Sequence, residues 1–521
     1  MKNVRHKNFV IADRGKFEKA LLLAGELYQV HESGVLQTNE QFYDTFDWLL
    51  YDKGYLLKNS GDQLLLTTVD DGMIAGQPRV AAHHFFSWDL DEDEVRQTIA
   101  PIADIRAMSQ IVLLKRTTTQ YDLRNKDGKT VARLFLEEGV ACGNGYGNDR
   151  AQNLEPLLRV EQLKGYENPF SRVVRCICRA GLQEAAGEAT MFLRGLSAIG
   201  RQVFDYSSNF AIQLEQNCTV RQAFCRICRQ LMESMERNYN GVLEDIDSEF
   251  LHDFRVAVRR TRSLVSQLKK YLPAERILFF QQEFKWLGRI SGPVRDLDVY
   301  LLSREQYKAM VPELLHDGLN AFFADLTAAR RSRLEEMREG LRSQRYADLM
   351  AGWKEFIADK EQGEEQEEHW AAAEQLCRPV AVKRIRKRFK KIVEKGSGID
   401  SSTPDEQLHM LRIDGKKLRY LLEFFRSLFD DDDIEYFRKQ LKKLQNNLGD
   451  FNDIAVQLEM LARHRDMLSG KSKRSVNIAA AIGGLITHLS AEHIALRQEF
   501  EQVFAGFSAT KNIKKFYAAI D

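Results

Sequence analysis

The sequence predicts an α+β protein in which an N-terminal antiparallel β-sheet or barrel precedes an all-helical domain. Short apolar or alternating runs, such as 64–68 and 131–136, are separated by Gly, Asn and Asp and indicate strands. They are confined to about the first 170 residues. Beyond them helical periodicity takes over, and a long part of the helical region occurs twice. We therefore expect a β domain at 1–200 and a helical domain at 201–521, with repeat halves at about 210–360 and 370–515.

The composition is that of an ordinary globular protein. A chain of 521 residues, with 44% hydrophobic and 29% charged residues, is long enough for more than one domain. The 76 basic and 75 acidic residues nearly cancel, so only local concentrations of charge are informative, such as the basic run 383–391. The N-terminus lacks the apolar core of a signal peptide, and no apolar run approaches about 20 residues. We therefore expect a cytoplasmic protein without membrane contact.

The seven cysteines are odd in number and have no framework spacing, which argues against a disulfide scaffold. Cys225 and Cys228 form a C-x-x-C, but it lies in a helical pattern without a second pair. We expect buried or idle thiols there.

The repeat carries basic residues in a fixed register. The members of the first copy are His252, Arg255, Arg259, Arg260, Arg262, and also Lys285, Arg221 and Arg226. Their counterparts, each 157 residues later, are His409, Arg412, Lys416, Lys417, Arg419, Lys442, Arg378 and Lys383. The offset holds without a gap from about 221 to 299, which indicates an internal duplication.

Most of these residues share one helix face. Positions 252, 255, 259 and 262 are spaced by 3, 4 and 3 residues, which aligns them on an α-helix. Arg260 falls roughly 80° outside this row. Like charges at such spacing repel by a few tenths of a kcal/mol per pair. A single basic row is commonly a solvated surface, but keeping the repulsion twice without acidic partners in the row favours an anion-binding role.

Two other functions of the repeat, metal binding by its histidines and acid–base catalysis by its aspartates, are less well supported. His252 and His409 are each surrounded by cations that would repel a metal ion, so we expect no metal there. Asp296 and Asp453 follow a Gly-containing segment and precede apolar runs, which predicts helix N-caps rather than acid–base catalysts. We expect no catalytic residue and no cofactor.

The first domain carries a recognisable set of segments, namely Tyr43-Asp44-Thr45-Phe46-Asp47-Trp48-Leu49, Gly54-Tyr55-Leu56-Leu57-Lys58, Lys115-Arg116, Arg133 and 159–165. Over residues 5–185 it resembles the CYTH family, the triphosphate tunnel enzymes. The resemblance implies a basic tunnel that binds a triphosphate, with a divalent metal held by glutamates of an N-terminal ExExK motif. Residues 8–13 contain no glutamate, so we expect the fold without the metal or the catalysis.

The second domain carries His252-x-x-Arg255-x-x-x-Arg259-Arg260-x-Arg262, then Leu287-Gly288-Arg289 and Arg295-Asp296, with the counterparts of the second copy. It resembles the CHAD family, helical domains that accompany CYTH domains and bind inorganic polyphosphate between two pseudo-symmetric bundles. The resemblance implies that the repeated basic residues, together with Arg289 and Arg295, bind polyphosphate in a central groove. The second copy has Lys416, Lys417 and Asn452 in place of arginines, which weakens bidentate phosphate recognition.

Sequence alone leaves three functions open. The favoured one is polyphosphate binding without catalysis, with an expected association with polyphosphate granules. The alternative is a metal-dependent triphosphatase or polyphosphatase with its active site in the N-terminal tunnel, which the missing glutamates oppose. Nucleic-acid binding through the basic groove is the third, and the scarcity of aromatics in the basic row opposes it.

Overall fold

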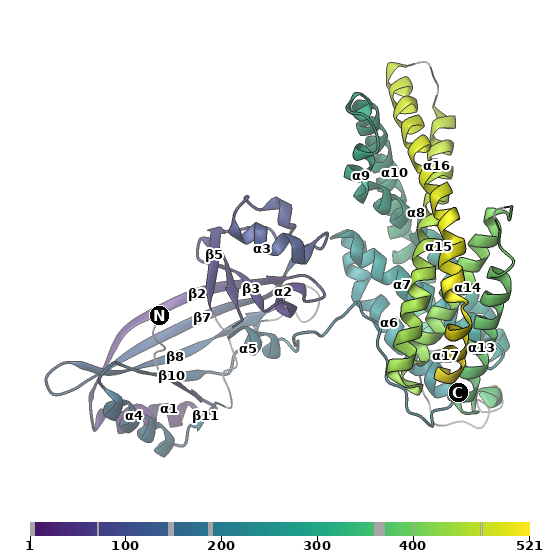
Figure 1. Ribbon diagram of the computed structural model, residues 1–521. Coiled ribbons are helices and arrows are strands. Elements are labelled where there is room, and N and C mark those ends of the chain that lie inside the picture. The colour runs from purple at the N-terminus through teal and green to yellow at the C-terminus, as the bar shows by residue number, and fades with distance from the viewer. Residues whose placement is uncertain are drawn as a thin grey trace. The chain divides into compact units, whose positions relative to one another are not determined.

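The computed structural model describes residues 6–69, 72–143, 151–185, 191–358, 370–400, 402–468, 470 and 472–520. The chain divides into two compact units, Met1–Ser208 and Asn209–Asp521, which are described separately (Figure 1).

The N-terminal unit is built on one antiparallel sheet with the strand order β11-β1-β10-β8-β7-β2-β3-β4-β5. These strands are β1 (His6–Val10), β2 (Gln29–Asp44), β3 (Tyr55–Ser60), β4 (Gln63–Thr68), β5 (Met73–Pro78), β7 (Met108–Arg124), β8 (Thr130–Cys142), β10 (Leu157–Gln162) and β11 (Gln183–Glu184). Two short strands lie off this path, since β6 (His84–Phe85) pairs with β7 and β9 (Gln152–Asn153) pairs with β8.

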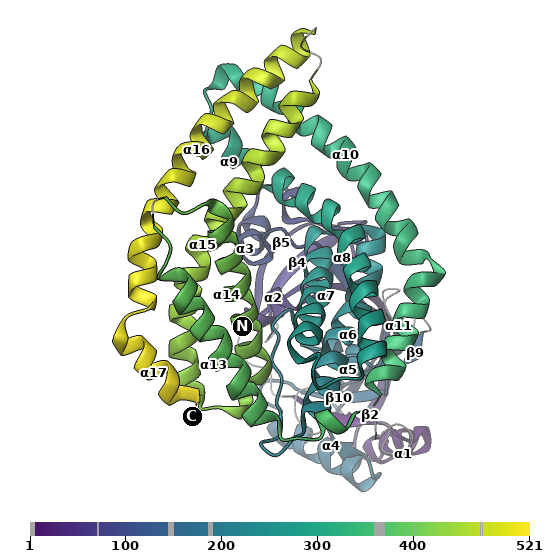
Figure 2. The ribbon, with the colours of Figure 1, turned by 90° about the vertical axis from the view of Figure 1, so that its right-hand side faces the viewer.

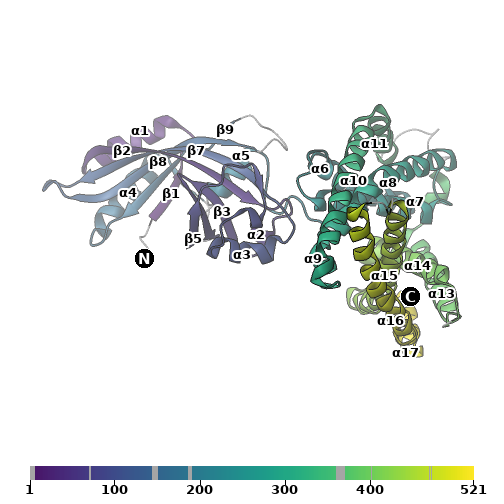
Figure 3. The same cartoon turned by 90° about the horizontal axis from the view of Figure 1, so that it is seen from above.

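The predicted antiparallel sheet is confirmed, but the sheet is not closed into a barrel. Among the described residues no pairing joins the end strands β5 and β11. Helix α3 (Glu94–Ala103) packs against β5, one end strand of this path (Figure 3). β11 is only two residues long and offers little edge for a partner.

Helices cover different parts of the two faces of this sheet. α1 (Arg14–Gly25) and α4 (Glu167–Arg179) pack on the face formed by Leu134, Leu136 and Leu158 (Figure 1). Side chains alternate along a strand, so the opposite face carries Leu114 and Ala141, on which α5 (Met191–Ala198) packs. α2 (Leu49–Asp52) and the turn η1 (Ser87–Asp89) lie with α3 at the β3–β5 end.

The regular elements of the second unit are all helices within its described residues, as predicted, apart from one isolated bridge. The first repeat contains α6 (Val220–Glu244), α7 (Ser248–Leu268), α8 (Ala274–Leu302), α9 (Arg304–Ala309), η2 (Glu313–Leu315), α10 (His316–Arg342) and α11 (Gln344–Ile357). The second contains η3 (Ala371–Ala373), α13 (Cys377–Gly396), α14 (Asp405–Phe425), η4 (Arg426–Leu428), α15 (Asp431–Met467), α16 (Lys473–Phe507) and α17 (Thr510–Ile520).

The duplication is visible in the helix boundaries. α6, α7 and α8 begin at 220, 248 and 274, and α13, α14 and α15 begin 157 residues later, at 377, 405 and 431. A short antiparallel bridge joins Thr219 to Leu376, which are themselves 157 apart. It is held by Val220 N donating to Gln375 O at 3.0 Å and by Cys377 N donating to Cys218 O at 2.9 Å. The donors Val220 and Cys377 are equivalent residues, 157 apart, and so are the acceptors Cys218 and Gln375. The two bonds are therefore related by a pseudo-two-fold axis that passes through this bridge.

The two repeats also share a core at their far ends, where α10 and α16 meet (Figure 2). Tyr300, Phe322 and Leu326 of the first repeat pack there with residues of α15 and α16. By length and composition α16 would be able to cross a membrane. Its residues Ile478, Ile482 and Leu485 are instead buried in this shared core.

Local sequence explains where the repeat helices start. Thr219 and Gln222 form a reciprocal capping box at the start of α6, and Asp247 accepts from the N–H groups of Glu249 and Phe250 at the start of α7. Asp296 and Asp453 are not N-caps, because each lies inside a continuous helix, α8 or α15. The prediction was wrong because Gly292 and Pro293 do not interrupt α8.

Candidate functional site

The first basic row (His252, Arg255, Arg259 and Arg262) lies on α7 beside α8. Arg255 Nη1 donates to Gly288 O at 3.1 Å and to Ser291 Oγ at 3.0 Å. A Cβ at Gly288 would come within 2.9 Å of the Arg262 guanidinium, so glycine leaves the space that this arginine occupies. A Cβ at Gly292 would lie 3.5 Å from the Arg255 guanidinium, which is an ordinary van der Waals contact. Of these two glycines of α8, Gly288 is therefore the one that leaves space for a row arginine.

The second basic row (His409, Arg412, Lys416 and Arg419) lies on α14 and uses side-chain partners. Arg412 Nη2 donates to Asp453 Oδ1 at 2.8 Å, and His409 Nδ1 contacts Asn452 Oδ1. Arg419 lies 3.2 Å from Glu423 on its own helix. Gly449, the counterpart of Gly292, has open space beside it. The second row is therefore held by polar side chains of α15 and α14.

The two rows lie close enough to influence each other's charge. Burial lowers the pKa of Lys416 to about 8, and repulsion from Arg412, Arg259 and Arg419 contributes. Burial also lowers the pKa of Arg412, which likewise feels Arg259 of the first row. Among the described residues no carboxylate forms an ion pair with Arg259, Arg262 or Lys416. The rows thus concentrate positive charge from both repeats.

A pair of aspartates marks one end of this charged region. Asp453 pairs with Arg412, and its counterpart Asp296 feels the equivalent Arg255. Burial raises the pKa of Tyr300 to about 12, and both aspartates add to that shift, which places them near the same ring. The charge therefore changes from positive to negative along α8 and α15, toward the core shared by the two repeats.

Residues 226–462 match the CHAD domain model. This part of the chain is a CHAD domain. The match does not extend to the N-terminal unit, for which the CYTH resemblance stays a prediction.

Relatives and solved structures are distant. Uncharacterized proteins from two strains of Mycobacterium tuberculosis are 27% identical over 216 residues, or 40% of this chain. The alignment spans only 39% of the length of each of these relatives. The crystal structure of the CHAD domain from Ricinus communis has 24% identity and a TM-score of 0.49, covering 57% of this chain and 95% of that one. PptA from Streptomyces chartreusis has 15% identity and a TM-score of 0.43, covering 55% and 99%.

Several other predicted binding residues of the CHAD domain are engaged by internal partners. Arg260 contacts Glu423 at 3.0 Å and lies over the Phe210 ring. Arg295 contacts Glu249 at 3.1 Å. Both side chains would have to exchange a carboxylate for a ligand before binding it.

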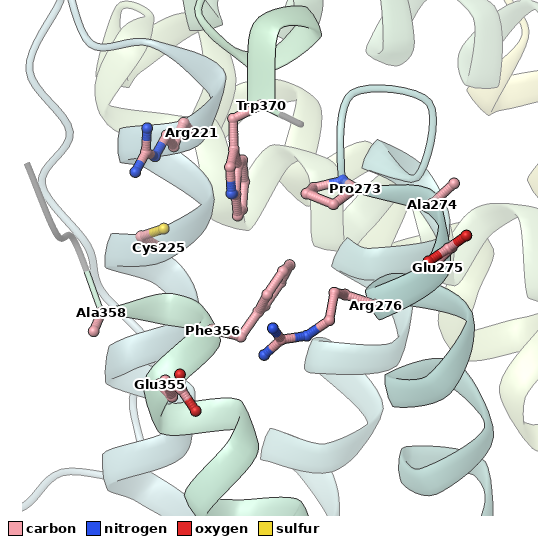
Figure 4. A pocket seen from close by; sticks show the side chains of 10 residues that line it. All are labelled: Arg221, Cys225, Pro273, Ala274, Glu275, Arg276, Glu355, Phe356, Ala358 and Trp370. Carbon is pink, nitrogen blue, oxygen red and sulfur yellow. The ribbon is translucent and has the colours of Figure 1, made fainter. Parts of the chain in front are cut away.

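Two further predicted binding residues, Arg221 and Arg378, lie near the start of each repeat. Arg221 contacts Glu374 at 3.5 Å, stacks on Trp370, and lines a cavity of about 450 Å³ with Arg276 and Phe356 (Figure 4). Its counterpart Arg378 donates to Leu428 O at 3.2 Å and lies over Phe429. Each of these arginines packs against an aromatic ring beside its helix.

Five further predicted residues are exposed on the surface of the CHAD domain, namely Arg226, Lys285, Arg289, Lys383 and Lys442. No ion pair to a carboxylate is recorded for these five within the described part of the chain. Lys285 and Lys442 are pseudo-symmetric and lie on α8 and α15, the helices that flank the rows. They are therefore available to extend a charged surface.

Lys417 belongs to a cluster that sequence analysis missed. The buried carboxylate of Asp414 is approached by Arg388 at 2.6 Å and by Lys391 and Lys395 at 3.2 Å each. Burial lowers the pKa of Lys417, and repulsion from Arg388 adds to that effect. Only the spacing of the run 383–391 against Asp414 could have signalled this cluster.

In the N-terminal unit the polar face of the sheet carries mixed charge. Glu40 contacts Lys58 at 2.8 Å and also contacts Arg116. Across the same face Arg159 lies 3.4 Å from Glu137. No group of three or more His, Cys, Asp or Glu side chains suited to a metal occurs among the described residues. The basic residues of this face are therefore largely matched by acidic neighbours.

Proposed function

We propose that the CHAD domain binds inorganic polyphosphate along the two basic rows, which would line a shared groove between the repeats. The observation that carries the proposal is the crowding of Arg259, Arg412 and Lys416, drawn from both repeats, without enough carboxylates to neutralise them. Maintaining such repulsion is costly unless a ligand relieves it. The family resemblance supplies the ligand class, since CHAD domains are associated with polyphosphate.

Polyphosphate suits this arrangement better than nucleic acid does. It is a linear polyanion without bases, so it needs rows of cations and no stacking platforms. The arginines of the first row offer bidentate donors, and the neutral fraction of Lys416, whose pKa is lowered to about 8, can gain a proton when a phosphate approaches. The triphosphatase alternative has no comparable support in the N-terminal unit.

The proposal is tested by titrating the full chain with polyphosphate at several salt concentrations. Arg259→Ala with Lys416→Ala removes one cation from each row, and neither residue has a carboxylate partner that would be left unpaired. Charge-assisted phosphate contacts contribute about 1.5–3 kcal/mol each, so affinity should fall roughly a hundredfold. The slope of log affinity against log salt should become shallower by about two.

The matched control is Arg333→Ala with Lys354→Ala, which removes the same charge from exposed positions on α10 and α11. Its affinity should stay within about threefold of the wild type. Unchanged binding in the row variant, with the fold intact by circular dichroism, would refute the proposal. Preference for an RNA of equal charge over polyphosphate at the same salt concentration would assign the rows to nucleic acid instead.

A further inference from the structure

Two buried cysteines lie at the point where the repeats are joined through their backbones. Cys218 is 6% exposed and Cys377 is 1% exposed. They flank the bridge between Thr219 and Leu376, and Cys377 N donates to Cys218 O at 2.9 Å. The two residues are therefore directly opposite each other on antiparallel segments.

Their placement suits a covalent bond. Opposed residues of an antiparallel pair have Cα atoms about 4.5–5.5 Å apart, and disulfides span about 4.4–6.8 Å. The two thiols already interact through a hydrogen bond. This contact lowers the pKa of Cys218 and raises the pKa of Cys377. Their contact therefore favours loss of a proton from Cys218 over loss of a proton from Cys377.

The other cysteines of this unit are placed differently. Cys225 and Cys228 lie about one turn apart on the same helix, α6. Burial raises the pKa of Cys228 well above its ordinary value. A thiol that stays protonated in an apolar helix core reacts poorly. The C-x-x-C that the sequence displays is thus the less reactive pair, although its spacing is the more conspicuous.

We propose that Cys218 and Cys377 form a disulfide under oxidising conditions and thereby link the two repeats of the CHAD domain at their pseudo-two-fold axis. The oxidant we name is hydrogen peroxide. The Cys218 thiolate attacks one peroxide oxygen, which forms a sulfenic acid and releases hydroxide that is protonated to water. The Cys377 sulfur then attacks the sulfenic sulfur, so that the S–S bond forms, the S–O bond breaks and a second water leaves. Two thiols and one peroxide thus give one disulfide and two waters.

The link would close a loop that contains the whole first repeat. Closing a loop of this length restricts the unfolded chain strongly, so the melting temperature of the helical unit should rise by about 5 °C or more. The bond lies on the backbone bridge and not on the basic rows, so it does not depend on the proposed polyphosphate binding.

The test uses the full chain with Cys142→Ser and Cys178→Ser, because these are the more exposed thiols and would link separate molecules. Peroxide-treated and untreated protein are digested without reductant and mapped by mass spectrometry. The expected product is one peptide pair joined through Cys218 and Cys377, lighter by two hydrogen atoms, with a raised melting temperature that a reductant reverses.

Variants separate this link from other oxidation. Cys377→Ser should lose both the joined peptide and the reversible rise in melting temperature, whereas Cys225→Ser with Cys228→Ser should keep both. The proposal is overturned if Cys218 and Cys377 stay reduced, if they are oxidised only to separate acids, or if the joined peptide contains Cys225 and Cys228. The peptide map of the parent protein decides the matter even where a variant folds poorly.

Discussion

Arg255 of the first repeat and Arg412 of the second occupy equivalent positions but are held in different ways. Arg255 donates to the Gly288 carbonyl and the Ser291 hydroxyl of α8. Arg412 is held by the carboxylate of Asp453, whose side chain is 61% exposed. The first arrangement keeps the full positive charge of the arginine, and the second neutralises part of it.

The repeats differ still more on the far side of α14. Asp414, with Arg388, Lys391 and Lys395 around it, belongs only to the second repeat, since the equivalent positions are Ala257, Leu231, Ser234 and Asn238. Duplication has therefore preserved the helix starts and the cationic row, while the buried polar contacts have diverged. This pattern indicates that the row is constrained by something other than the fold.

The largest expected effect is the loss of stability on removing Asp414, which has no counterpart in the first repeat. Asp414→Ala should lower the free energy of unfolding by about 3 kcal/mol, because three cations lose their buried partner. Asp453→Ala removes an exposed carboxylate and should cost less than about 1 kcal/mol. Chemical denaturation of both variants measures the difference. Equal stability of the two variants would show that the Asp414 cluster contributes no more to the free energy of unfolding than the exposed Asp453 does.

The Asp414 carboxylate should also make the free energy of unfolding sensitive to acid. Burial tends to raise the pKa of Asp414, but Lys391, Lys395 and Arg388 hold it below its usual value. A carboxyl with a lowered folded pKa contributes stability above its unfolded pKa of about 4 and loses it as the pH falls through the folded value. Unfolding free energy should therefore drop below pH 4 by more in the wild type than in Asp414→Asn. Parallel curves for the two proteins would contradict this.

A smaller effect compares the two central row residues, Arg259 and its counterpart Lys416. At pH 6 both are charged, and alanine at either position should weaken polyphosphate binding roughly tenfold. At pH 9 Lys416 is largely neutral, since its pKa is about 8, so Lys416→Ala should then cost only about threefold. Arg259→Ala should cost the same at both pH values. Isothermal titration at the two pH values measures the contrast, and equal losses for both variants at pH 9 would remove it.

The pH dependence can itself be abolished. Polyphosphate favours the charged lysine, so wild-type affinity should fall by up to about tenfold as the pH rises from 7 to 9. Lys416→Arg keeps its charge in this range and should flatten that dependence while leaving affinity at pH 6 within about threefold. A wild-type profile that is already flat would mean that burial and the neighbouring Arg412, Arg259 and Arg419 do not lower the pKa of Lys416.

The smallest expected effect is in the N-terminal unit. With Mg²⁺ or Mn²⁺ the protein should not hydrolyse triphosphate or ATP at rates near 1 s⁻¹, a slow but ordinary enzyme rate. The reason is that β1 offers Asn8 where metal-binding glutamates are expected, and Glu40 is already held by Lys58. A metal-dependent turnover that disappears on removing residues 1–208 would restore the triphosphatase hypothesis.

The sequence by itself determined the division into a β part and a helical part, the duplication and the alignment of each basic row. These are local properties, because helical periodicity, capping residues such as Thr219 and a constant offset of 157 are written along the chain. The alignment of His252, Arg255, Arg259 and Arg262 followed from helix geometry alone.

Only the tertiary structure decided which cations are free. Arg260 and Arg295 were predicted to bind polyphosphate together with the rows, yet Glu423 of α14 and Glu249 of α7 contact them. Gly292 and Pro293 look like a turn in sequence, but α8 continues through them. Ion pairs, helix–helix contacts and sheet closure depend on residues distant in the chain, so no local pattern fixes them.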